Sequence, residues 1–181
     1  MYSKILFKLI EESVFPALGF FILKVIISLT MLSSFGYRVD LSSVFWAEVT
    51  RTQYVEIVSN ILLSFAIFSF IGVFYSLIKS LYFHDSHVSP SLTLKLFHLR
   101  AGFLIQDSFH LFTQTLVWLL FSYMTLFISM MFFYLGLLNF YVLVVSLLVC
   151  PMATYFYLLD LEYELKNQED GSLNVEEIVV Q

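Results

Sequence analysis

Four predominantly apolar stretches recur along this chain, and the segments between them contain nearly all of its charged side chains. They cover about Phe15–Phe35, Ile57–Ile78, Leu111–Tyr134 and Phe140–Leu159. Because a helix rises about 1.5 Å per residue, roughly 20 apolar residues cross about 30 Å of hydrocarbon. The pattern therefore predicts an all-α fold, a polytopic integral membrane protein with four transmembrane helices that occupy residues 14–161.

The segments outside the spans are short. Residues 1–13 place several apolar side chains on one helical face and charges elsewhere, which predicts an N-terminal amphipathic helix at the membrane interface. A loop of residues 79–110 joins the second and third spans. Residues 162–181 form a short acidic tail, which we expect to be flexible, with fraying at Asp170 and Gly171.

The distribution of basic residues predicts the orientation of the spans. With four spans, the termini and the 79–110 loop share one side, and this side has six lysines and arginines against two on the other. The positive-inside rule then places both termini in the cytoplasm of a bacterial cell, or in the matrix or stroma behind an organellar inner membrane. The two sets are Lys4, Lys8, Lys79, Lys95, Arg100 and Lys166 against Arg38 and Arg51.

Composition excludes several classes of function. The net charge of −5 arises in the tail, and no dense basic patch is present, which argues against nucleic-acid binding. The single cysteine, Cys150, allows neither an intrachain disulfide nor a cysteine-rich metal site. No nucleophile elbow, phosphate-binding glycine loop or HExxH motif occurs, so we expect a protein that is not an enzyme.

Lys24 is a charged residue close to the middle of the first span. A lysine at the bilayer midplane costs roughly 2.5–3.5 kcal/mol on insertion scales, so it needs a partner or water. One interpretation is that it faces a polar path, a bound anion or a carboxylate of another chain. The other is that it hydrogen-bonds to Asn60, Gln114 or backbone carbonyls within the bundle.

A histidine cluster offers weak metal-binding potential. His84 and His87 are three residues apart with Asp85 between them, a spacing that could supply part of a zinc or iron site. Two histidines and one aspartate are an incomplete ligand set, and histidines at a membrane interface also explain the pattern. Apart from such a metal ion, no cofactor is expected.

The third span has a polar stripe. Four of its residues are candidates for a polar path or a subunit contact: Asp107, His110, Thr113 and Gln114. Polar side chains in lipid face other helices or water, so the stripe either packs within the bundle or lines a path together with Lys24.

Small residues and proline predict helix packing. Gly72, Ser76 and Ser80 form a ridge at four-residue spacing that permits close helix approach. Pro151, within the fourth span, predicts a kink about one turn earlier.

Two functions fit these features best. The first is a non-catalytic subunit or scaffold of a larger membrane assembly, whose partners are the bilayer and other membrane subunits. The alternative is a small homo-oligomeric channel or transporter, since four spans seldom enclose a path alone. A metal-assisted membrane enzyme that uses the histidine cluster is a third, weaker hypothesis.

Overall fold

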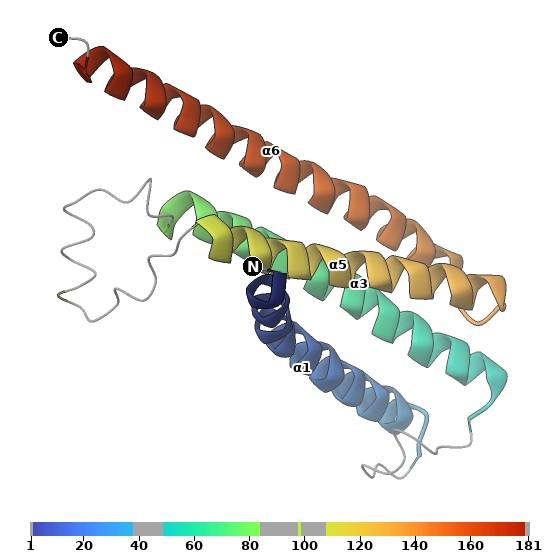
Figure 1. Ribbon diagram of the computed structural model, residues 1–181. Helices are drawn as coiled ribbons and strands as arrows, with labels where there is room; N and C mark the ends of the chain where they lie inside the picture. Colours follow the sequence, from blue (N-terminus) through green and yellow to red (C-terminus); the bar gives the residue numbers. More distant parts are fainter. Residues whose placement is uncertain (1, 38–48, 84–97, 99–107, 180–181) are drawn as a thin grey trace.

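The computed structural model describes residues 2–37, 49–83, 98 and 108–179 and contains four long helices within them (Figure 1). All four are long and apolar enough to cross a membrane. The predicted all-α fold with four membrane-spanning helices is therefore confirmed. The helices are α1 (Tyr2–Ser34), α3 (Arg51–Phe83), α5 (Ser108–Tyr134) and α6 (Phe140–Val179).

The helices extend beyond the predicted spans, because hydropathy marks the hydrocarbon region and not the hydrogen-bonded backbone. α1 joins the expected interfacial segment and the first span in one helix. α6 continues to Val179 and includes Asp170 and Gly171, the two residues at which we expected the helix to fray. A single glycine within a helix costs only about 1 kcal/mol relative to alanine, which does not end a helix by itself.

Two glycines end the helices on the side opposite the termini. Gly36 and Gly136 adopt positive φ angles of 80° and 66°, and each lies two residues after the last residue of its helix, α1 or α5. The next residue, Leu137, donates its N–H to the carbonyl of Phe132 at 2.9 Å, which completes a Schellman-type cap. The chain then enters α6 within a few residues, so α5 and α6 form an antiparallel hairpin.

The helices form a three-helix unit with a peripheral fourth. α3, α5 and α6 each pack against the other two, whereas α1 packs against α3 and α5 (Figure 1). At the other end of the hairpin, α6 diverges from α3 and α5 toward its C-terminus (Figure 1). One face of α1 is therefore the only part of that helix that reaches the core.

Small side chains fill the seam between the helices. They recur at spacings of three, four or seven residues, as in left-handed helix packing, and small residues let helix backbones approach closely. Their hydroxyl groups donate to carbonyls of the preceding turn, as from Ser76 to Gly72 and from Thr115 to Leu111, both at 3.0 Å. Buried members of the seam are Ser59, Ala66, Ser69, Ser76, Ser80, Thr115, Ser122, Thr125, Ser129, Ser146, Cys150 and Ala153.

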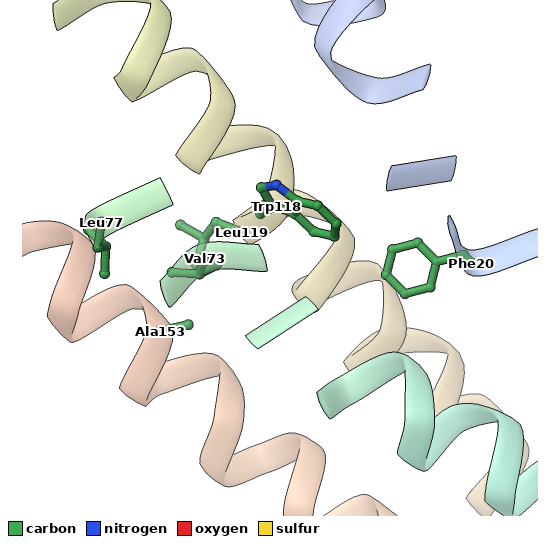
Figure 2. Packing of buried hydrophobic residues seen from close by; sticks show 6 residues of the cluster. All are labelled: Phe20, Val73, Leu77, Trp118, Leu119 and Ala153. Atoms are coloured by element: carbon green, nitrogen blue, oxygen red, sulfur yellow. The ribbon is translucent and has the colours of Figure 1, made fainter. Parts of the chain in front are cut away.

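Aromatic residues attach α1 to this unit. Phe20 shares a buried cluster with side chains of the other three helices (Figure 2): Trp118 and Leu119 of α5, Val73 and Leu77 of α3, and Ala153 of α6. The Phe20 ring stacks on Phe121 with centroids 5.0 Å apart. Such aromatic pairs contribute about 0.5–1.5 kcal/mol beyond the area that they bury.

The seam predicts a disulfide from a single substitution. The Oγ atom of Ser122 lies 3.2 Å from the Sγ atom of Cys150, across the α5–α6 contact. We expect Ser122→Cys to form an intrachain disulfide with Cys150 under a membrane-permeable oxidant, seen as loss of both free thiols by intact-mass spectrometry. Leu120→Cys, on the exposed side of α5, should keep both thiols free; two free thiols in Ser122→Cys would contradict this helix register.

Candidate functional site

Polar and charged side chains from three helices meet at one end of the bundle. We call this group the Glu12 cluster; its members are Lys8 and Glu12 of α1, Lys79 of α3, and His110 and Gln114 of α5. It lies at the N-terminal end of α1 and α5 and the C-terminal end of α3.

Glu12 is at the centre of this cluster. Its Oε1 atom lies 3.2 Å from Nδ1 of His110 and 3.5 Å from Nζ of Lys8. Its side chain is only 13% exposed, whereas that of the neighbouring Glu11 is 74% exposed. A carboxylate held away from water is stabilised by nearby positive charge and hydrogen-bond donors, so the cluster fixes the position of α1 against α5.

Lys79 extends the cluster to α3. Its ammonium group donates to Oε1 of Gln114 at 3.5 Å, and the carboxylate of Glu12 acts on it electrostatically. The cluster thus joins the three helices through charged and amide groups at the edge of the apolar region. A nucleophile paired with a base is absent from it, so the arrangement favours helix attachment over covalent chemistry.

The residues expected around Lys24 lie in different parts of the bundle. Asn60 donates to the carbonyl of Glu56 at 2.9 Å and contacts the sulfur of Met31. Gln114 instead bonds Lys79, which follows Asn60 in α3 by roughly 28 Å of helical rise. Lys24 itself is half-buried in α1 and interacts with other groups of the protein. The structure therefore does not bring Asn60 and Gln114 together around it.

The polar stripe of the third span faces other helices. Thr113 is buried, and further along α5 the hydroxyl groups of Tyr123 and Thr154 lie 2.8 Å apart. Ser129 and Ser146 face one another with 3.5 Å between their Oγ atoms. These contacts connect α5 to α6, as expected of polar side chains that hold helices together in lipid.

The predicted ridge of α3 lies against α5. Ser76 and Ser80 are buried, and an added Cβ atom at Gly72 would overlap the indole ring of Trp118. Pro151 is exposed on α6, and the helix continues through it.

The candidate metal ligands His84, Asp85 and His87 lie outside the described residues, as does Asp107. Within the described part of the chain, no group of three histidine, cysteine or acidic side chains could hold a metal ion.

Sequence reasoning missed the members of the Glu12 cluster that come from α1 and α3. Lys8 and Glu12 fit a solvated face of an amphipathic helix, and Lys79 fits a basic residue at a membrane boundary. One pattern in the sequence indicates such a cluster: charged residues of three spans lie near the same membrane boundary, where they can come into contact with one another.

Comparison with known proteins gives no relative: no family model, no curated protein and no solved structure matches this chain.

Proposed function

We propose that the protein is a non-catalytic integral subunit or scaffold of a larger membrane assembly. This proposal rests on one observation: in the described helices, polar groups bond to other helices of the same chain. The polar face of α5 bonds α6, and the Glu12 cluster bonds α1 to α3 and α5. Contacts within the chain account for His110, Gln114, Ser122 and Tyr123, which supports a structural role for these residues.

The outer surface of α1 supplies a large apolar area for a partner. The helix packs on α3 and α5 along one face, and the remaining apolar side chains are exposed. In the bilayer this face meets either lipid or the helices of another subunit. Exposed members of this face include Phe7, Phe15, Leu18, Phe21, Ile22 and Ile26.

A homo-oligomeric channel or transporter is the second candidate. It would need polar residues on an outward face, so that symmetry-related copies could line a path. Thr113, Ser122 and Thr125 are instead buried within one copy. Lys24 supports the channel or transporter hypothesis, because charged residues within the membrane mark functional positions by default.

The proposed orientation puts the Glu12 cluster on the cytoplasmic side of a bacterial membrane, or on the matrix or stromal side of an organellar membrane. The charge count supports this orientation, since Lys8 and Lys79 belong to the more basic side.

Native mass spectrometry of the protein released gently from its own membrane tests the proposed function. We expect a complex whose mass contains this chain together with other polypeptides. A homo-oligomer of fixed number would contradict the subunit proposal. In that case ion flux into liposomes that contain this homo-oligomer, compared with Lys24→Met, would test the channel.

A further inference from the structure

A groove opens between α3 and α6 at the end of the bundle that carries the Glu12 cluster. It has a volume of about 310 Å³, which is within the range of small-molecule sites. It lies where α6 diverges from α3 toward its C-terminus (Figure 1). Its α3 wall is apolar and includes Phe74, Ile78 and Leu81.

The α6 wall adds polar groups to the same groove. Leu159 continues the apolar surface, while Asp160 and Tyr163 supply a carboxylate and a phenol. Among the described residues that line the groove, Asp160 is the one with an acidic side chain, and it is only 9% exposed. A carboxylate and a phenol at the end of an apolar groove favour a ligand that combines a cationic hydrogen-bond donor with a hydrocarbon chain.

The depth of these groups fits a lipid. Asp160 follows the start of α6 by roughly 30 Å of helical rise, which is the thickness of the hydrocarbon core. It therefore lies where lipid headgroups begin. The wall from Leu81 back to Phe74 extends roughly 10 Å deeper along α3, beside the acyl chains.

From this arrangement we propose that the groove binds an aminophospholipid, with its primary ammonium group at Asp160 and an acyl chain along the α3 wall. A primary ammonium donates three hydrogen bonds to carboxylate and phenol oxygens. A choline group has no N–H to donate, and an anionic glycerol headgroup brings no positive charge to the carboxylate. The site is independent of the subunit proposal, because it uses a different surface from α1.

Native mass spectrometry of the full-length chain in detergent tests the site with three lipids that share the same acyl chains: phosphatidylethanolamine, phosphatidylcholine and phosphatidylglycerol. We expect the ethanolamine lipid to bind roughly tenfold more tightly than the others, as a charge-assisted hydrogen bond implies. Asp160→Asn should abolish this preference, whereas Glu162→Gln, at an exposed acid on the same helix, should retain it.

A second variant keeps the test decisive if Asp160→Asn does not fold. Leu81→Trp fills the apolar part of the groove and should reduce bound lipid of all three kinds, with Asp160 intact. Equal binding of the three lipids by the parent chain would overturn the proposal. So would an unchanged lipid preference in Asp160→Asn, or a second copy of the chain that excludes lipid from the groove.

Discussion

Replacing Gly72 with leucine is expected to lower the free energy of unfolding by about 3 kcal/mol, because the new side chain must enter the space of the Trp118 ring. The indole ring is poorly able to move. It is almost fully buried, and its neighbours Phe20 and Phe68 lie with ring centroids 6.4 and 5.2 Å away. Unfolding in a mixed-micelle titration, followed by tryptophan fluorescence, measures the change.

The adjacent position provides a control. Ile71 is exposed on the outer side of α3, and Ile71→Leu should change stability by less than about 0.5 kcal/mol. A double substitution tests the contact itself: Trp118→Ala alone costs about 3–5 kcal/mol, but leucine at position 72 can occupy part of the vacated volume. The double variant should therefore lose less free energy of unfolding than the two single variants lose together. Strictly additive losses would refute the contact.

Glu12→Ala is expected to lower the free energy of unfolding by about 2 kcal/mol and to loosen the attachment of α1. The substitution removes a mostly buried carboxylate that bonds His110 and Lys8, and hydrogen bonds to charged groups contribute about 1.5–3 kcal/mol each. It also leaves the cationic groups of the cluster without their carboxylate. Hydrogen exchange along α1, together with the unfolding titration, measures both effects.

Glu11→Ala is the matched control for this prediction. Glu11 is the adjacent acid on the same helix and lies 4.0 Å from the same lysine, but its side chain is mostly exposed. Exposed ion pairs contribute about 0–1 kcal/mol, so this variant should exchange like the parent protein. Equal effects of the two substitutions would mean that net charge, and not the contact with His110, stabilises the end of α1.

The spans could be predicted from sequence because burial in lipid imposes a single requirement on some twenty consecutive residues. The predicted spans coincide with helices to within one residue, Phe35 lying just past α1, although α1 and α6 are much longer than their apolar parts. Helix ends beyond the hydrocarbon depend on local backbone bonds. Hydropathy carries no information about them.

The Glu12 cluster could not be predicted with the same rules. Glu12 and His110 are far apart in the chain, and their meeting depends on which face α1 presents to α5. That face is selected by packing of Phe20 against Trp118 and Phe121, which a hydropathy plot treats as interchangeable apolar residues. The serine-rich seam is easier to predict, since the recurrence of its small residues every three, four or seven positions is visible in the sequence.

The peripheral position of α1 has a consequence for biosynthesis. α1 leaves the ribosome before the other described helices, yet part of its packing surface belongs to α5, which is made much later. Until α5 enters the membrane, Phe20 lacks Trp118 and Phe121, and the carboxylate of Glu12 lacks His110. The nascent chain must therefore hold α1 in the bilayer beside α3, and the packing of α1 is completed only when α5 arrives.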